Sequence, residues 1–144
     1  MKLRKSGDKS KSRKTGKNEN KRILIVDDEP DVSLVLKKVF ENAGFAAESY
    51  DDPVLALKNF RTGSYDLILL DIKMPEMDGF SLYRQLKKQD NNAKICFLTA
   101  SEMYFSRLRK DEDFCKLDEG LFIHKPIGNE ELIRKVNALI NKHY

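Results

Sequence analysis

The chain has 144 residues, of which 40% are hydrophobic, and this length suits a single domain with its own core. No apolar run approaches the roughly 18 residues that span a membrane, and no apolar stretch follows the charged N-terminus as it would in a signal peptide. We therefore expect a cytoplasmic protein without membrane contact, in which Cys96 and Cys115 are reduced thiols rather than a disulfide.

The net charge of +4 is unevenly distributed along the chain. Residues 1–22 contain ten Lys or Arg against two acidic residues, whereas the rest of the chain carries a net charge of −4. With one Leu and no aromatic residue, this segment has too little apolar surface to offset the entropy lost on ordering. We therefore expect a disordered basic tail, residues 1–20, and one domain, residues 21–144. The tail could contact nucleic acid through its phosphates, contact an acidic partner, or remain solvated.

Five short apolar segments predict strands that are buried on both faces. In chain order they are residues 22–26, 45–50 (the weakest of them), 67–70, 94–98 and 121–124. Amphipathic patterns between the strands predict helices at about 32–43, ended by Gly44, at about 53–60, with Asp52 as N-cap, from Asp78-Gly79 onward, and up to about 142, capped by Asn129. In residues 102–119 the helical pattern is interrupted by charged residues, so the shape of this segment stays open.

This alternation indicates an α/β fold, in which a doubly wound, five-stranded parallel sheet is covered by helices on both faces. In such folds, ligands bind at the carboxyl ends of the strands, near the point where the strand order reverses. The residues that follow the strands are Asp27, Asp28 and Glu29 after the first, Asp71 after the third, Thr99 after the fourth and Lys125 after the fifth. We expect these side chains to converge on one edge of the sheet.

Each of these side chains also has an ordinary structural explanation, as an acid at a helix start, a turn residue or a solvated lysine. Together they indicate a cation site, because crowded carboxylates raise each other's pKa unless a positive charge joins them. Mg²⁺ fits best, since it prefers oxygen ligands. Zinc does not fit, because His124 and His143 lack His or Cys partners at ligand spacing. A Ser-His-Asp triad does not fit either, because the chain has no Gly-x-Ser-x-Gly segment.

The segments "ILIVDDEP", "YDLILLDIKMPEMDGF", "FLTAS" and "FIHKPI" resemble, in this order, the four motif blocks of response regulator receiver domains. The resemblance covers residues 21–143 and implies a flavodoxin-like (βα)5 fold. The residues with implied roles are the phosphoacceptor Asp71, the Mg²⁺ ligands Asp27, Asp28, Asp71 and the backbone carbonyl of Lys73, and the phosphoryl-contacting residues Thr99 and Lys125. A carboxylate in this position can act as a nucleophile toward phosphorus.

The same resemblance implies a conformational switch and two positions that set the rate of dephosphorylation. The Thr99 hydroxyl would swing toward the phosphoryl group, and the ring of Phe122 would enter the space that it leaves. Two positions that flank the path of the hydrolytic water, here Lys73 and Ser101, would tune the rate of dephosphorylation. Of these two, Lys73 is expected to have the larger effect, because its length and charge let it shield the phosphoryl group.

The implied function is a phosphoacceptor switch of a two-component phosphorelay, which takes its phosphoryl group from a sensor histidine kinase or a phosphotransfer protein. Phosphorylation would change the surface of the fourth helix, fifth strand and fifth helix, where an unidentified downstream protein binds. We expect no output domain and no enzymatic activity beyond the chain's own phosphorylation and dephosphorylation. The main alternative is a receiver-like interaction module that works without phosphorylation. A Mg²⁺-dependent phosphohydrolase is less favoured, because Asp71-Ile72-Lys73 lacks the second aspartate of an Asp-x-Asp pair.

Overall fold

The computed structural model describes residues 21–100, 110, 117 and 119–142. Within them, five strands form one parallel sheet in the order β3-β2-β4-β5-β6. The strands are β2 (Arg22–Val26), β3 (Ala46–Tyr50), β4 (Leu67–Leu70), β5 (Ile95–Thr99) and β6 (Phe122–His124). The predicted parallel sheet is confirmed. The predictions for the tail, for Ser101 and for most of residues 102–119 concern residues outside this description.

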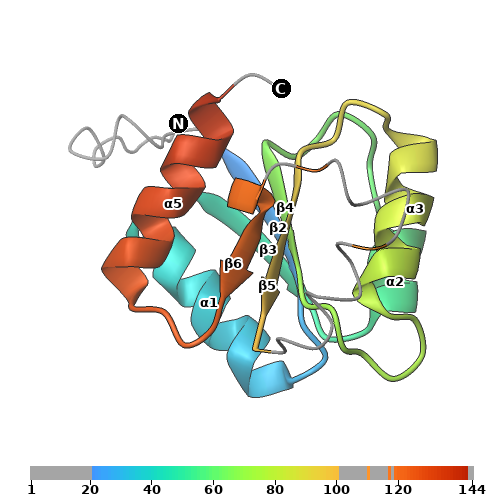
Figure 1. Ribbon diagram of the computed structural model, residues 1–144, viewed down its shortest axis with the longest axis horizontal. Helices are drawn as coiled ribbons and strands as arrows, with labels where there is room; N and C mark the ends of the chain where they lie inside the picture. The colour runs from blue at the N-terminus through green and yellow to red at the C-terminus, as the bar shows by residue number, and fades with distance from the viewer. Residues whose placement is uncertain (1–20, 101–109, 111–116, 118, 143–144) are drawn as a thin grey trace, which may run out of the picture.

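Helices cover both faces of the sheet, as the alternating pattern predicts (Figure 1). They are α1 (Pro30–Asn42), α2 (Pro53–Lys58), α3 (Gly79–Gln89) and α5 (Asn129–Asn141), and a short 3-10 turn, η2 (Glu119–Leu121), precedes β6. In Figure 1, α1 and α5 lie on one face of the sheet, and α2 and α3 lie on the other. Among the described residues, no helix has both the length and the apolar character that a membrane crossing requires.

The core consists mainly of the central strands and the helix residues that pack on them. Every residue of β4 and β5 is buried, and so is every residue of β2 except the first. Phe40 of α1 and Leu82 of α3 approach the sheet from its opposite faces, and both are fully buried. Because complete burial of one such side chain stabilises a fold by about 1.5–3 kcal/mol, these continuous apolar runs fix the sheet to both helix layers.

The strand order reverses at β2, and this reversal locates the functional edge of the sheet. From β2 the chain passes to β3 on one side, and then crosses to β4 on the other side. The ladder between β2 and β4 pairs Val26 with Leu70, which are the last residues of the two strands. Asp27 and Asp71 therefore leave the sheet side by side, at the position where ligands bind in open α/β sheets.

One of the two predicted N-caps is confirmed, and so is the predicted helix start at Asp78-Gly79. The Asp52 carboxylate accepts a hydrogen bond from the Val54 amide at 2.9 Å, and the Asp78 carboxylate accepts one from the Ser81 amide at 2.9 Å. The assignment of Asn129 as a cap is wrong, because Gly128 holds the N-cap position of α5. Its backbone is extended there (φ −71°, ψ 154°), and Asn129 becomes the first helical residue.

Several predicted boundaries differ from the structure by one or two residues, and specific contacts explain two of these differences. The fourth strand begins at Ile95 rather than at residue 94. Its predicted first residue, Lys94, directs its ammonium to the carbonyls of Leu139, Ile140 and Lys142, at 2.7, 3.0 and 2.6 Å. A positive charge at this end of α5 complements the helix dipole. The helix α2 ends at Lys58, two residues before the predicted end, because Phe60 donates to the carbonyl of Leu57 and tightens the last turn.

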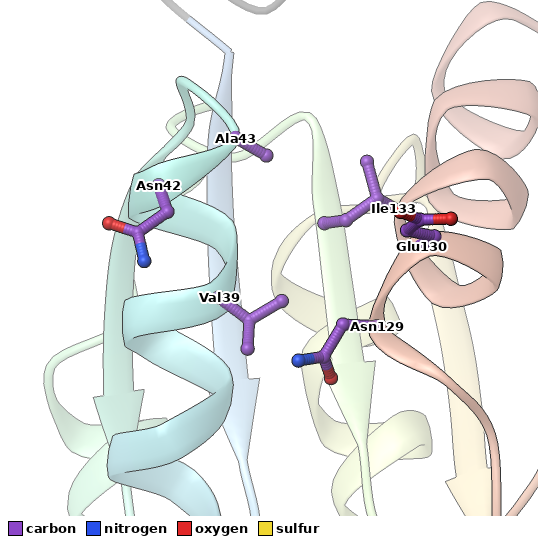
Figure 2. A pocket seen from close by; sticks show the side chains of 6 residues that line it. All are labelled: Val39, Asn42, Ala43, Asn129, Glu130 and Ile133. Atoms are coloured by element: carbon purple, nitrogen blue, oxygen red, sulfur yellow. The ribbon is translucent and has the colours of Figure 1, made fainter.

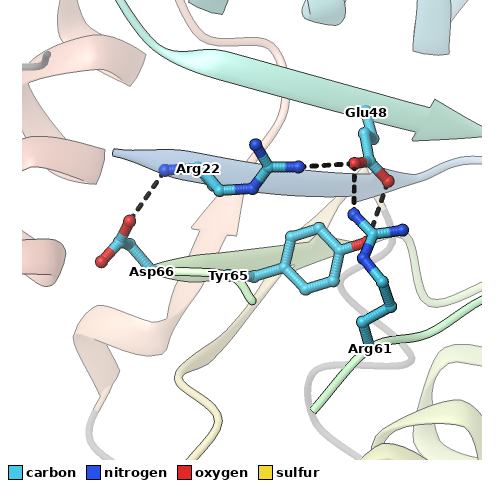
Figure 3. Close-up of polar contacts among 5 residues, drawn as sticks. All are labelled: Arg22, Glu48, Arg61, Tyr65 and Asp66. Atoms are coloured by element: carbon cyan, nitrogen blue, oxygen red, sulfur yellow. Dashed lines mark hydrogen bonds and ion pairs between the residues drawn. The ribbon is translucent and has the colours of Figure 1, made fainter. Parts of the chain in front are cut away.

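A polar cluster ties the loop before β4 to the edge of the sheet (Figure 3). Glu48 of β3 accepts hydrogen bonds from the guanidinium groups of Arg22 and Arg61 and from the Tyr65 hydroxyl, each at 2.8 Å. Asp66 accepts one from the Arg22 amide at 2.8 Å. Burial alone would raise the pKa of Glu48, but the hydrogen bonds from Arg61 and Tyr65 more than offset it and lower the pKa below its usual value.

Candidate functional site

Three carboxylates converge at the reversal point of the sheet. Asp27 and Asp28 follow β2, Asp71 follows β4, and one ligand atom from each lies within 4.8 Å of the other two. Asp27 is buried, whereas Asp28 and Asp71 are partly exposed. An oxygen-only set of this kind fits a hard divalent cation such as Mg²⁺. The three acids thus offer the donor set that such an ion needs.

Two hydrogen bonds to neighbouring backbone groups hold Asp71 in place. Its amide donates to the Val26 carbonyl at 2.9 Å, and its Oδ1 accepts from the Ile72 amide at 2.8 Å. The pKa of its carboxyl is raised to about 6, first by burial and then by the charge of Asp27, although Lys125 acts in the opposite direction. A carboxylate with a raised pKa beside other acids is typical of a functional site.

Lys125 forms an ion pair with one of the three acids. Its ammonium lies 3.1 Å from Oδ2 of Asp27, and its amide donates to the Thr99 carbonyl at 2.9 Å. The other oxygen of Asp27, Oδ1, accepts from the Glu29 amide at 3.0 Å. The buried negative charge is therefore compensated by one cation and one backbone donor, as a buried carboxylate requires.

A cavity of about 780 Å³ opens over these side chains. It is lined by Asp28, Glu29, Asp71, Lys73, Met74, Pro75, Thr99, Ala100 and Lys125. Every predicted site residue that follows a strand borders the cavity except Asp27, which is buried beneath Lys125. The Lys73 side chain is exposed at its rim. The cavity is large enough for a small phosphorylated group.

Phe122 already lies in the core next to β5. Its ring stacks on that of Phe97, with 5.4 Å between the ring centroids and an interplanar angle of 8°. The β5-β6 ladder pairs these two residues, and it pairs Thr99 with His124. Thr99 and Phe122 are both buried, and they lie on neighbouring strands, two ladder positions apart.

Sequence reasoning treated Gly79 only as a helix start and missed its contact with the site. Its amide donates to the Ile72 carbonyl at 2.7 Å, which ties α3 to the residue that follows Asp71. The only signal in the sequence is a glycine directly after a capping aspartate, and this pattern is common where no site exists. The distance to Asp71 could not be read from it.

The family model described as response regulator receiver domain matches residues 23–137. The chain belongs to this family. It is therefore a receiver domain of two-component signalling, and the flavodoxin-like fold implied by its motifs is confirmed.

Similar proteins include both long and short regulators. The transcriptional regulatory protein RprY of Bacteroides fragilis is 31% identical over 125 residues, covering 87% of this chain and 51% of RprY. The response regulator receiver protein CpdR of Brucella abortus is 29% identical over 120 residues, covering 83% of this chain and 97% of CpdR. The receiver domain thus spans about half the length of the long relative and nearly all of the short one.

Two solved structures contain a similar chain, the response regulator TrrA of Thermotoga maritima. One is TrrA in complex with Mg²⁺-BeF, with a TM-score of 0.67 and 34% identity, covering 83% of this chain and 98% of that one. The other is the histidine kinase ThkA in complex with TrrA, with a TM-score of 0.68 and 37% identity, covering 83% and 97%.

Proposed function

We propose that this receiver domain is a phosphoacceptor switch and that Asp71 accepts the phosphoryl group. The observation that carries the proposal is the placement of Asp71, which lies at the end of β4 beside Asp27 and Asp28 and borders the open cavity with Thr99 and Lys125. A carboxylate that merely ended a strand would need no other acids, hydroxyl group or lysine beside it. A metal that shields the negative charge and a cation that can meet a phosphoryl oxygen are what the transfer requires.

In the proposed transfer, Asp71 is the nucleophile. An oxygen of the Asp71 carboxylate forms a bond to phosphorus, and the bond between phosphorus and the histidine nitrogen of the donor breaks, with its electron pair going to that nitrogen. Mg²⁺ held by Asp27, Asp28, Asp71 and the Lys73 carbonyl would neutralise charge on the phosphoryl oxygens. Lys125 pairs with Asp27 at 3.1 Å and borders the same cavity as Asp71. On phosphorylation it would exchange Asp27 for a phosphoryl oxygen. The chain acts only on itself in this scheme and has no separate substrate.

The surface next to the site suits a protein donor of the histidine kinase or phosphotransfer class. The helix α1 begins two residues after Asp28, so its first turns lie next to the site. Two apolar side chains of these turns, Leu34 and Val35, are 54% and 58% exposed. A pocket of about 370 Å³ lies between α1 and α5. Figure 2 shows Val39 of α1 and Ile133 of α5 among the side chains that line it. Exposed apolar side chains beside a polar site are typical of a protein contact. The complex of ThkA with TrrA supports a kinase as the partner.

We propose that the output of the switch is the surface of the fourth helix, β6 and α5, of which the expected fourth helix lies outside the described residues. The Thr99 hydroxyl would turn toward the phosphoryl group, and Phe122, now stacked on Phe97, would respond by repacking. The ring signals of Phe122 in an NMR spectrum should shift when Mg²⁺ and beryllofluoride are added to the wild type. A shift of the same size in Thr99→Ala would separate Phe122 from Thr99 and contradict this coupling.

Labelling by a small phosphodonor tests the central proposal. With acetyl phosphate and Mg²⁺, the wild type should gain the mass of one phosphoryl group, whereas Asp71→Asn should gain none. Asp51→Asn is the matched control, because Asp51 is an exposed aspartate that follows β3 and does not line the cavity. Asp28→Ala should weaken Mg²⁺ binding strongly, since it removes a negative ligand. Equal labelling of wild type and Asp71→Asn would move the acceptor to another residue. No labelling of any form would favour the interaction module that works without phosphorylation.

The partner surface needs a separate test with a histidine kinase as donor. Val35→Asp should slow phosphotransfer from the kinase and leave labelling by acetyl phosphate unchanged, because the small donor does not need the helix surface. Val54→Asp is the matched control, since Val54 is 46% exposed but belongs to α2, on the other face of the sheet. Equal kinase-dependent rates for Val35→Asp and Val54→Asp would exclude α1 as the docking surface.

A further inference from the structure

The first turn of α3 is hydrogen-bonded to Ile72, the residue that follows Asp71. Asp78 caps this helix by accepting from the Ser81 amide, and the amide of Gly79, the first helical residue, donates to the Ile72 carbonyl at 2.7 Å. Gly79 is buried. The chain after β4 therefore bends back so that the start of α3 lies directly against it.

This contact leaves no room for a side chain at position 79. A Cβ atom on Gly79 would lie 2.4 Å from the carbonyl oxygen of Asp71 and 2.9 Å from the Cα atom of Ile72. Both are backbone atoms, so neither can move away by changing a rotamer. The positive φ angles among the described glycines are at Gly44 and Gly63, so Gly79 is not required for its conformation. Its small size is what the position demands.

The peptide group that a Cβ on Gly79 would strike also orients the carboxylate of Asp71. This group consists of the Asp71 carbonyl and the Ile72 amide, and the amide donates to Oδ1 of Asp71 at 2.8 Å. A methyl group that displaced the carbonyl oxygen would rotate the whole group, because a peptide bond is planar. The hydrogen bond that sets the carboxylate would rotate with it.

We infer that Gly79 is a positioning residue for Asp71, and that the absence of its side chain sets the direction in which the carboxylate faces the cavity and the neighbouring acids. The inference rests on the proposed function, in which Asp71 is the phosphoacceptor. Misplacing a nucleophile by about 1 Å can reduce its rate by about 100-fold. With a Cβ 2.4 Å from the Asp71 carbonyl oxygen, the backbone beside the carboxylate must shift.

The test compares Gly79→Ala with Gly128→Ala. Both glycines lie at helix starts, but a Cβ on Gly128 would meet no atom within 4 Å, and its φ of −71° suits alanine. At a temperature where circular dichroism shows both variants folded, Gly79→Ala should lower the rate constant of labelling by acetyl phosphate at least tenfold and raise the Mg²⁺ dissociation constant. Gly128→Ala should match the wild type in both. A merely structural defect would lower the fraction of protein labelled and leave both constants unchanged.

A second measurement covers the case in which Gly79→Ala does not fold. In wild-type NMR spectra, the amide signal of Gly79 should shift when Mg²⁺ is added, and the signals of Gly63 and Gly128 should not. Gly79→Ala with wild-type constants, or an unresponsive Gly79 signal, overturns the inference and leaves the phosphoacceptor role intact. A wild type that binds Mg²⁺ and shifts the Gly79 signal but is never labelled overturns the proposed function instead.

Discussion

The ammonium of Lys125 lies 3.1 Å from a carboxylate oxygen of Asp27, which is 98 residues away in the sequence. The side chain of Asp27 is 3% exposed and that of Lys125 is 24% exposed, so most of the pair is shielded from water. Removing one member of such a pair leaves an uncompensated buried charge, which costs more than the loss of the attraction itself. This asymmetry leads to the first prediction.

Lys125→Met should lower the free energy of unfolding by about 2 kcal/mol at pH 7.5 without Mg²⁺, because it leaves Asp27 buried and unpaired. The double variant Lys125→Met/Asp27→Asn should recover most of this loss. Urea unfolding curves measure both. Lys37→Met, which breaks an exposed pair with Glu41, is the matched control and should cost less than about 0.5 kcal/mol. An equal loss in the single and the double variant would show that the charge of Asp27 is not what Lys125 stabilises.

Asp71 should make the stability of the protein depend on pH. Its folded pKa is raised from the usual 3.8 to about 6, so the folded state binds the proton more tightly than the unfolded state does. Its contribution is therefore most favourable below about pH 4 and is lost as the pH rises through 6. At pH 7.5, Asp71→Asn should unfold with a free energy higher by about 1–2 kcal/mol, a value that allows for partial solvent screening.

The advantage of Asp71→Asn should shrink toward zero at pH 4, where the wild-type carboxyl is protonated. It should also shrink when Mg²⁺ is added at pH 7.5, because the metal removes the same repulsion. Thermal unfolding over the pH series measures the difference. A constant difference between the two proteins from pH 4 to 7.5 would contradict the raised pKa.

Glu48 should contribute stability with the opposite dependence on pH. Its folded pKa is lowered, so its contribution is present above the usual pKa of the carboxyl and is lost as the pH falls through the folded value. Glu48→Gln weakens the hydrogen bonds from Arg22, Arg61 and Tyr65 shown in Figure 3, and should cost about 1 kcal/mol at pH 7.

The loss in Glu48→Gln should shrink as the pH falls through the lowered folded pKa of Glu48, because the wild-type carboxyl is then neutral as well. Glu41→Gln is the matched control, since Glu41 belongs to an exposed pair within one helix, and it should change the unfolding free energy by less than about 0.5 kcal/mol. If Glu48→Gln costs as little as Glu41→Gln, the cluster at the sheet edge does not stabilise the fold.

Lys73 should prolong the phosphorylated state. Its side chain is exposed at the rim of the cavity that contains Asp71, where it can shield the phosphoryl oxygens from an approaching water. Lys73→Ala should shorten the phosphorylated lifetime several-fold, whereas Ser101→Ala, at a position outside the described residues, should change it little. Intact mass followed after removal of the donor measures the decay. A longer lifetime in Lys73→Ala would reverse the roles of these two positions.

The sequence by itself determined the elements and the edge at which the acids gather. The apolar runs around Leu24 and Leu69 are continuous because helices cover both faces of their strands, and this pattern can be read without a structure. Asp52 was recognisable as a cap, because a cap acts on amides two or three residues away. The convergence of Asp27 and Asp71 follows from parallel strands, whose carboxyl ends share one edge.

Only the tertiary structure decided which of these groups touch. The pairing of Lys125 with Asp27, the raised pKa of Asp71 and the contact of Gly79 with the Asp71 carbonyl depend on strand order and on distances between segments far apart in the sequence. Asn129 was misjudged for the same kind of reason, because Asn129 and its neighbour Gly128 both suit an N-cap, and only the backbone path into α5 selects Gly128. Local patterns specify backbone hydrogen bonding, whereas contacts between side chains depend on the position of every element at once.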